Sequence, residues 1–250
     1  MAAAHGRHVQ VLASTVPFAA WPMPALARLV GAASLSAHAR GDLIHAGGSE
    51  IAAATLVVDG VVQASVAAAG GRRVIFEICR GASVHGLLPL LDGRAMPNDL
   101  IAIEPTTTLA IPFAAIRDEL ALAPTLWQTL CEGAAQRARC YAEQMMQFLF
   151  DAPRVRMAAV LLSLAQGEAE ATDGPVVVGM RLPQGRLAEM IGLSRQWATS
   201  LVRELSEAGL IEWRYGRVTL LDPAALRGIA LESINASIHA TRATEAPPPV

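Results

Sequence analysis

Apolar and polar residues are arranged differently in the two halves of the chain. Between about residues 34 and 112, short segments rich in Val, Ile and Leu are separated by Gly or Asp. These segments are 43–45, 55–58, 61–66, 73–79, 84–91, 100–104 and 107–111. Short strands at regular spacing, with turn residues between them, are typical of a small all-β barrel or sandwich. The Asp59-Gly60 pair is the strongest hairpin signal among them.

Helical spacing replaces this pattern on both sides of the strand-rich region. We expect no regular structure from residue 1 to about 17, and a strand over 176–180. A short helix over 21–33 would turn Leu26, Leu29 and Val30 inward. The further helices that we expect lie at 113–122, 124–150 and 155–164.

The long segment 124–150 carries a heptad pattern. Its apolar or small residues recur at alternating spacings of four and three: Trp127, Cys131, Ala134, Ala138, Tyr141, Met145 and Phe148. This spacing is typical of a coiled-coil seam, although a helix packed against its own domain is the alternative. We favour a seam between two copies of the chain, because the helix is long and is flanked by two other regions.

The C-terminal stretch 181–222 predicts two short helices with a tight break between them. Leu187, Met190 and Ile191 give the first helix an apolar face, and Gly192 ends it. Ser194 is a natural N-cap for the second helix, which ends at Gly209. The buried face of the second helix is expected to comprise Ala198, Leu201, Val202, Leu205 and Ala208.

The other face of the second helix has the chemistry of a DNA reader. It carries Arg195, Gln196, Thr199, Ser200 and Arg203. Arginine and glutamine make bidentate contacts with guanine and adenine edges in the major groove. A strand–turn–strand follows at 211–218, and its Arg214 and Arg217 suit phosphate contact. The pattern therefore predicts a winged helix-turn-helix, with a protein-interaction module as the alternative.

Composition narrows the class of protein. The chain has 250 residues, enough for two domains, and a net charge of −2, so DNA binding must rest on a local patch and on dimerisation. No apolar run approaches the roughly 20 residues of a membrane helix, so we expect a cytoplasmic protein without membrane contact. No paired carboxylates, nucleophile motif or Gly-rich phosphate loop indicates an enzyme.

Several motifs together resemble one protein family. They lie at residues 43–47, 58–60, 111–113, 191–196, 205–211 and 216–217. Over about residues 26–230 the chain resembles the CRP/FNR family of bacterial transcription regulators. The resemblance implies an α+β protein: an N-terminal β-barrel of the cyclic-nucleotide-binding-like jelly-roll type, a long dimerisation helix and a C-terminal winged helix-turn-helix. The implied domains are 1–123, 124–150 and 151–235, followed by a disordered tail over 236–250.

The resemblance also assigns partners and DNA contacts. It implies double-stranded DNA, a second copy of the chain and RNA polymerase as partners. Arg195 falls at a guanine-reading position, Ser194 and Arg203 at phosphate-contacting positions, and Gln196 where many members carry a glutamate. Ser200 replaces a second base-reading arginine of several members, which implies a changed target site.

The sensor residues depart from the family pattern. The glutamate that holds a cyclic nucleotide falls on Gly86 and the arginine on about Pro97, which leaves Arg94 as the nearest substitute cation. A buried phosphate needs a cationic, bidentate partner, so the resemblance argues against cAMP. The candidate effector pocket comprises Val84, His85, Gly86, Leu87, Leu88 and Asn98.

Other signals stay open at this point. Three cysteines, at 79, 131 and 140, exclude a four-cysteine iron–sulfur cluster and have no metal-site spacing. Haem sensing is an alternative, because His85 falls where haem-binding relatives place a ligand. Redox sensing is another alternative, because Cys131 would face Cys131 of the second copy across the predicted seam, where the two thiols could oxidise. A hydrophobic metabolite, or no ligand, is equally compatible with the apolar pocket residues.

Overall fold

The computed structural model describes residues 2–67, 73–165, 172 and 174–233. The chain divides into two compact units: unit 1 is Met1–Ala67 with Ile75–Arg139, and unit 2 is Ala68–Val74 with Cys140–Val250. The expected disordered tail over 236–250 lies outside the described residues. No helix in the described ranges combines the length and the apolar character that a membrane crossing requires.

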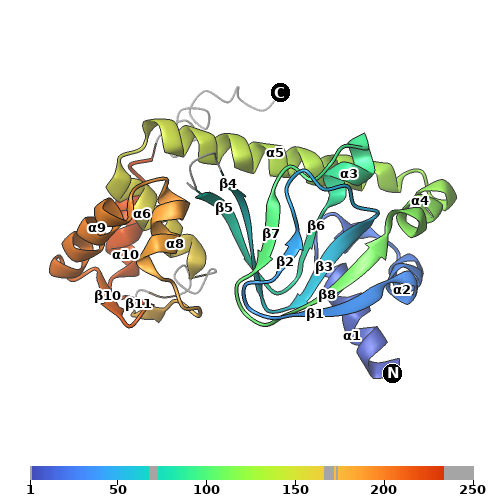
Figure 1. The fold of residues 1–250 in the computed structure, drawn as a ribbon, viewed down its shortest axis with the longest axis horizontal. Helices are drawn as coiled ribbons and strands as arrows, with labels where there is room; N and C mark the ends of the chain where they lie inside the picture. Colours follow the sequence, from blue (N-terminus) through green and yellow to red (C-terminus); the bar gives the residue numbers. More distant parts are fainter. Residues whose placement is uncertain (1, 68–72, 166–171, 173, 234–250) are drawn as a thin grey trace, which may run out of the picture. The chain divides into compact units, whose positions relative to one another are not determined.

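Unit 1 is built on two four-stranded sheets (Figure 1). One sheet has the order β1-β8-β3-β6, and the other has the order β2-β7-β4-β5. The strands are β1 (Ser34–His38), β2 (Leu43–His45), β3 (Ala53–Asp59), β4 (Val61–Ala67), β5 (Arg73–Arg80), β6 (Ser83–His85), β7 (Asp99–Ala102) and β8 (Thr106–Pro112). The expected jelly roll is confirmed, but its two sheets do not close into a barrel.

Strand β3 explains why this region has runs of consecutive apolar residues. Leu56 and Val58 face the larger hydrophobic core, whereas Val57 belongs to a second core with Val62 and Leu100. Both faces of the strand are therefore covered, and strict alternation with polar residues is not needed.

The hairpin predicted at Asp59-Gly60 is wrong in one respect. The turn is present, with Gly60 at φ +100°, but β3 and β4 belong to different sheets. A Cβ atom at Gly60 would come within 2.5 Å of the carbonyl oxygen of Pro105. Glycine thus lets the backbone pass closely over the 105–106 turn as the chain changes sheets.

The strand expected over 84–91 is also wrong. Strand β6 ends at His85, and helix α3 (Leu87–Asp92) follows directly. Gly86, at φ +81°, separates the two elements in the left-handed region. Short apolar runs do not distinguish a buried strand from a buried helix, and here a glycine on either side favours the helix.

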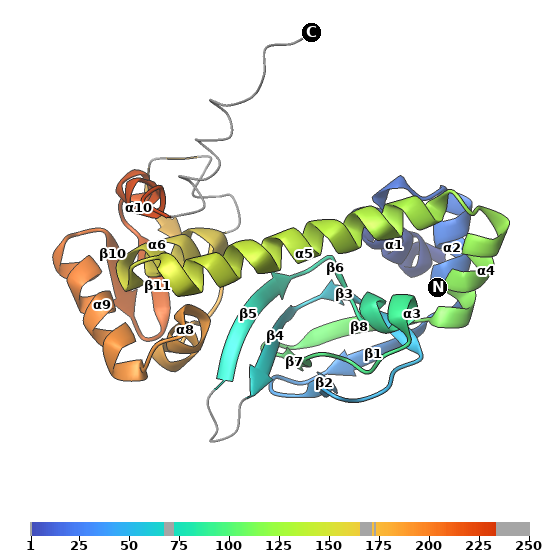
Figure 2. The ribbon, with the colours of Figure 1, turned by 90° about the horizontal axis from the view of Figure 1, so that it is seen from above.

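Helices cover one end of unit 1 (Figure 2). They are α1 (Ala2–Ala13), the short 3₁₀ helix η1 (Phe18–Ala20), α2 (Met23–Ala32) and α4 (Phe113–Leu122). Helices α2 and α4 agree with expectation, but the prediction that residues 1–17 lack regular structure is wrong. Alanine-rich α1 buries Val9 and Leu12 in the same core as Phe18 and Trp21.

The long helix is α5 (Leu126–Phe150), and the boundary between the two units falls within it. Its first turns belong to unit 1, where Leu126 and Leu130 are buried. The Trp21 indole N–H also donates to the Thr129 hydroxyl at 2.8 Å. The N-terminal half of the helix is therefore fixed to the core of unit 1.

Unit 2 combines helices with a three-stranded sheet of order β10-β11-β9. Its elements after α5 are α6 (Pro153–Leu164), β9 (Val176–Val177), α8 (Gln184–Ile191), α9 (Arg195–Glu207), β10 (Ile211–Arg214), β11 (Arg217–Leu220) and α10 (Pro223–Ala230). The expected strand over 176–180 is reduced to two residues. Helix α10 was not predicted, and the Asp222 carboxylate caps it by accepting from the Ala225 N–H at 2.8 Å.

The apolar face predicted for α9 is buried, with one exception. Ala198, Leu201, Val202 and Leu205 are buried, but Ala208 is exposed. Ala208 is the residue that caps the helix C-terminus, and Gly209 at φ +71° turns the chain away beyond it. The helical spacing therefore holds only as far as the last full turn.

Candidate nucleic-acid interface and sensor site

The break between α8 and α9 is fixed by two residues that the sequence singled out. Gly192 ends α8 in the left-handed conformation, at φ +69°. The Ser194 hydroxyl accepts a hydrogen bond from the Trp197 N–H at 3.3 Å and so caps α9. The cap thus engages one of the backbone N–H groups at the start of α9, where the side chains of Arg195, Gln196 and Trp197 are exposed.

The five polar side chains predicted to face away from the core of unit 2 all lie on the exposed face of α9: Arg195, Gln196, Thr199, Ser200 and Arg203. Within the described residues, no hydrogen bond or ion pair engages the Arg195 guanidinium or the Gln196 amide. The Thr199 hydroxyl is held within the motif, because it lies 2.9 Å from both the Arg195 carbonyl oxygen and the Gln184 Oε1 atom. Arg195 and Gln196 are therefore available to an external partner.

Sequence reasoning passed over one residue on this helix. Trp197 is 60% exposed, although it lies one position before the buried Ala198. A large aromatic side chain in an exposed first turn is unusual, and its position directly after the Arg195-Gln196 pair was the available signal. It adds an apolar surface beside the two polar base-reading candidates.

The turn after α9 also presents cations. Strands β10 and β11 pair antiparallel, with Arg214 opposite Arg217. Both arginines are exposed, and the Arg214 guanidinium forms an ion pair with Glu212 at 2.7 Å. The predicted wing is thus present, with Arg217 the less engaged of its two cations.

The end of α5 packs on the helix-turn-helix within unit 2. The Phe148 ring lies against Gly192, and the Arg156 guanidinium lies 5.6 Å from the centre of that ring. Arg156 Nη1 also donates to the Phe148 carbonyl oxygen at 3.4 Å. Burial lowers the pKa of Arg156 from its ordinary value. Phe148, predicted to lie on the seam between subunits, therefore contacts its own chain.

The other predicted seam residues on α5 are a mixture of exposed and half-buried side chains. Trp127, Cys131, Ala138 and Met145 are exposed, and Ala134 and Tyr141 are half-buried. Near the end of the helix, Leu149 and Phe150 are exposed as well. Phe148 apart, several apolar residues of α5 are therefore left uncovered by the residues that the structure describes.

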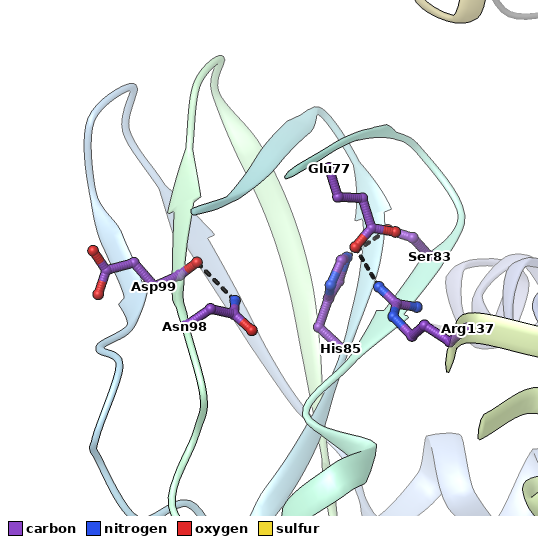
Figure 3. A network of polar contacts seen from close by, with 6 residues as sticks. All are labelled: Glu77, Ser83, His85, Asn98, Asp99 and Arg137. Atoms are coloured by element: carbon purple, nitrogen blue, oxygen red, sulfur yellow. Dashed lines mark hydrogen bonds and ion pairs between the residues drawn. The ribbon is translucent and has the colours of Figure 1, made fainter. Parts of the chain in front are cut away.

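Unit 1 contains a polar cluster that only partly overlaps the predicted effector pocket (Figure 3). Glu77 on β5 forms an ion pair with Arg137 on α5. His85 on β6 lies beside this pair, and its Nε2 atom is 3.0 Å from the Ser83 hydroxyl. Sequence reasoning found His85 but missed Glu77 and Arg137. The available signal was a single carboxylate within the apolar segment 73–79.

Burial changes the titration of this cluster. His85 is 6% exposed, and burial lowers its pKa to about 4. Burial also raises the pKa of the nearby Cys79 thiol to about 12, with the Glu77 carboxylate adding to the effect. His45 has a lowered pKa for the same reason as His85, and its Nε2 atom lies 2.6 Å from the Thr55 hydroxyl. At neutral pH His85 is therefore uncharged and Cys79 is a thiol.

The remaining predicted pocket residues do not converge on His85. Val84 is buried, Leu87 is half-buried and Leu88 is exposed on α3. The Asn98 amide donates instead to the carbonyl oxygen of Asp99 at 2.9 Å (Figure 3). A side chain at Gly86 would meet Ile51 Cδ1 at 2.7 Å, so a glutamate there would require rearrangement.

Arg94, the substitute cation, lies elsewhere. It lines a groove of about 540 Å³ together with Glu50, Phe113 and Arg117. Within the described ranges, no group of three or more His, Cys, Asp or Glu is placed to hold a metal ion. The three cysteines are free thiols, and Cys131 and Cys140 are exposed.

Comparison with known proteins matches this architecture. Residues 155–229 match the family model of the Crp-like helix-turn-helix domain. A global nitrogen regulator of Synechococcus elongatus is 26% identical over 190 residues, which cover 75% of this chain and 85% of the relative. A CRP-like cAMP-activated global transcriptional regulator of Mycobacterium tuberculosis is 23% identical over 187 residues, covering 75% and 84%.

Solved structures share the fold. FixK2 from Bradyrhizobium japonicum superposes with a TM-score of 0.69 at 18% identity, covering 79% of this chain and 96% of that one. A CRP/FNR-family transcriptional regulator from Thermus thermophilus gives a TM-score of 0.61 at 24% identity, covering 79% and 98%. Residues 155–229 are therefore a Crp-like helix-turn-helix domain, and the relatives and structural neighbours of the chain are transcription regulators of the CRP/FNR type with cyclic-nucleotide-binding folds.

Proposed function

We propose that this regulator binds an inverted-repeat operator as a homodimer and that a signal received in unit 1 controls the binding. The observation that supports DNA binding is the start of α9, where the N-cap residue Ser194 precedes Arg195 and Gln196. Both of these side chains are exposed, and neither makes a hydrogen bond or ion pair with the described residues. Two such helices in a dimer would enter successive major grooves roughly 34 Å apart. Arg217 and Arg203 would contact phosphates on either side.

The test is selection of duplexes from a random pool with the full-length chain, followed by binding titrations across a salt series. We expect a recovered motif with two-fold symmetry and an affinity that falls steeply as salt rises. Failure to recover any motif, together with no salt-dependent binding to duplex DNA, would assign the helix-turn-helix to protein interaction instead.

The dimer proposal rests on the uncovered apolar residues of α5. Met145 is 59% exposed at a predicted seam position, and Cys131 and Ala138 are exposed at earlier positions of the same pattern. Parallel helices with this spacing bury such residues against a second copy. A Met145→Glu variant should sediment as a monomer and bind half-sites only, whereas Glu143→Gln, a charge change on the same turn, serves as the control.

We further propose that the signal acts on the Glu77–Arg137 pair. This pair joins a strand of the jelly roll to the helix that carries the predicted seam, so any ligand or charge change that separates the two side chains would alter the pose of α5. The effect on DNA binding would be a shift of population between two poses. An Arg137→Gln variant should change operator affinity without changing which sequence is selected. An unchanged operator affinity of this variant would contradict the proposal that the signal acts on the Glu77–Arg137 pair.

We also propose that cAMP is not the signal. The positions at which the resemblance places the cyclic-nucleotide-binding glutamate and arginine are occupied by Gly86 and Pro97. Isothermal titration with cAMP at millimolar concentration should show no heat of binding and no change in operator affinity. Saturable cAMP binding would overturn this part and would direct attention to Arg94. Native mass spectrometry and an absorption spectrum of the purified protein would reveal haem or another retained ligand at the same time.

A further inference from the structure

The wing is closed by a two-residue turn whose first residue is unexpected. Arg214 pairs with Arg217 in the β10–β11 register, so the loop consists of Tyr215 and Gly216. Both residues have positive φ, +51° and +75°. This is the pattern of a type I′ hairpin turn, whose first position favours Asn, Asp or Gly.

Tyrosine is a poor choice for that backbone. Among the described residues, Tyr215 is the one non-glycine residue with positive φ. The left-handed region is sterically unfavourable for a bulky side chain, and positions that keep such a conformation are concentrated at functional sites. Folding alone would be better served by Asn or Gly, so the tyrosine side chain requires another explanation.

The side chain has no role within the unit. Tyr215 is 95% exposed, and its hydroxyl has no hydrogen-bond partner in the part of the chain that the structure describes. The two residues that flank the loop, Arg214 and Arg217, are exposed cations. A hydrogen-bond donor and an aromatic ring between two cations are suited to an anionic partner that also offers a flat apolar surface.

The tip lies close to the base-reading helix. The Leu182 N–H donates to the Gly216 carbonyl oxygen at 2.7 Å, which fixes the tip beside the start of α8. Two residues further on, the Gln184 side chain accepts from the Thr199 hydroxyl of α9 at 2.9 Å. The wing tip and the exposed face of α9 therefore meet at the same end of α8.

We propose that Tyr215 contacts the sugar–phosphate backbone of the operator, with its hydroxyl donating to a phosphate oxygen and its ring packing on a deoxyribose. This inference rests on the proposed DNA binding and assigns to the wing a contact beyond its two arginines. Because the phenol is uncharged, the contact adds affinity without releasing a counterion.

The test compares Tyr215→Asn, Tyr215→Phe and the wild type on the duplex selected with the wild type, with Leu231→Asn as a control for removal of an exposed large side chain. We expect Tyr215→Asn to bind about 5- to 20-fold more weakly, at an unchanged salt slope, while its thermal midpoint stays equal or rises. Tyr215→Phe should lie between the two, and the control should match the wild type.

The outcomes separate the two proposals. If the wild type binds its duplex and Tyr215→Asn binds within two-fold of it, the Tyr215 contact is wrong while DNA binding stands. A lower thermal midpoint in Tyr215→Asn would assign the tyrosine to folding instead and would also overturn the inference. If the wild type selects no duplex, the proposed function itself fails. The chain has two tyrosines, so fluorotyrosine labelling offers a direct readout: the ¹⁹F signal that is absent from Tyr215→Asn should shift when duplex is added.

Discussion

The Cε1 atom of Phe148 lies 2.7 Å from the position that a Cβ atom on Gly192 would occupy. This contact joins the last turn of α5 to the break of the helix-turn-helix. Glycine is therefore required at position 192 for two reasons. The backbone there is left-handed, at φ +69°, and the Phe148 ring leaves no room for a side chain. Any change in α5 that moves Phe148 acts directly on the segment that orients α9.

A Gly192→Ala substitution should therefore destabilise unit 2. The left-handed backbone costs about 1–2 kcal/mol for a residue with a Cβ atom, and the collision with Phe148 adds to it. We expect a decrease of about 2 kcal/mol or more in the free energy of unfolding, measured by urea denaturation of the full-length chain.

Gly185→Ala provides the matched control. Gly185 lies in the same helix, and its Cβ atom would have no neighbour within 4 Å. Alanine should be neutral there or stabilise by up to about 1 kcal/mol. In a Phe148→Ala background, Gly192→Ala should cost only the backbone part. An equal cost in both backgrounds would contradict the packing role of Phe148.

The stability of unit 1 should depend on the protonation of His85. Burial lowers the pKa of His85 to about 4, so the unfolded chain binds this proton first as the pH falls. The contribution of neutral His85 to the free energy of unfolding is complete above the ordinary histidine pKa of about 6.5. It is lost as the pH falls from there toward about 4. Over that window it amounts to about 3 kcal/mol, at about 1.36 kcal/mol per pKa unit.

Urea unfolding at several pH values between 7 and 5 measures this effect before most carboxylates titrate. A His85→Gln variant should show a flatter pH profile than the wild type, whereas replacement of the exposed His5 by Gln should leave the profile unchanged. If His85→Gln keeps the full pH dependence, the proton uptake belongs to another group.

The thiols should fall into two classes of reactivity. The thiolate is the reactive form, and burial raises the pKa of Cys79 to about 12, whereas Cys131 and Cys140 are exposed. In a Cys131→Ser/Cys140→Ser chain, Cys79 should react with a disulfide reagent at pH 8 about 100-fold or more slowly than Cys140 does in a Cys79→Ser/Cys131→Ser chain. Comparable rates would show that Cys79 is accessible as a thiolate and would support redox sensing by unit 1.

The sequence predicted the DNA-facing half of this molecule better than the sensor half, for a physical reason. Helices such as α9 are determined by local signals, and its cap at Ser194, its end at Gly209 and its exposed polar face can each be identified from neighbouring residues. The Glu77–Arg137 pair joins residues that are 60 positions apart, and no local pattern indicates such a pairing.

The errors in the strand region have the same origin. Strand β3 pairs with β6 and β8, whereas β4 pairs with β5 and β7, so the two strands do not pair with each other. The Asp59-Gly60 turn could be predicted from local residues, but this change of sheet could not. The apolar run 84–91 also suited either a strand or a helix, and the left-handed Gly86 decided between them. Helix α1 was missed because its buried residues, Val9 and Leu12, are few among alanines.

Replacing each of the two arginines on α9 should weaken DNA binding in a different way. Arg195 is exposed and unengaged at the first turn, where a bidentate contact with a guanine edge is available in the major groove. Arg195→Ala should cost about 1–3 kcal/mol on the selected operator and relax the preference at a single base-pair position in each half-site. Arg203 lies two turns further along α9, paired loosely with Glu207 at 3.6 Å, and suits a phosphate.

Arg203→Gln should weaken binding to matched and mismatched duplexes by the same factor and lower the salt slope by about 0.9 for each phosphate that the variant no longer neutralises. Both variants are measured by titration against the operator and a set of single-base variants at three or more salt concentrations. The Ser194→Ala variant separates folding from recognition, because it should cost about 1 kcal/mol in helix stability while keeping the base preference. If Arg195→Ala weakened all duplexes equally, the base-reading role would pass to Gln196 or Trp197, the two exposed side chains that follow it.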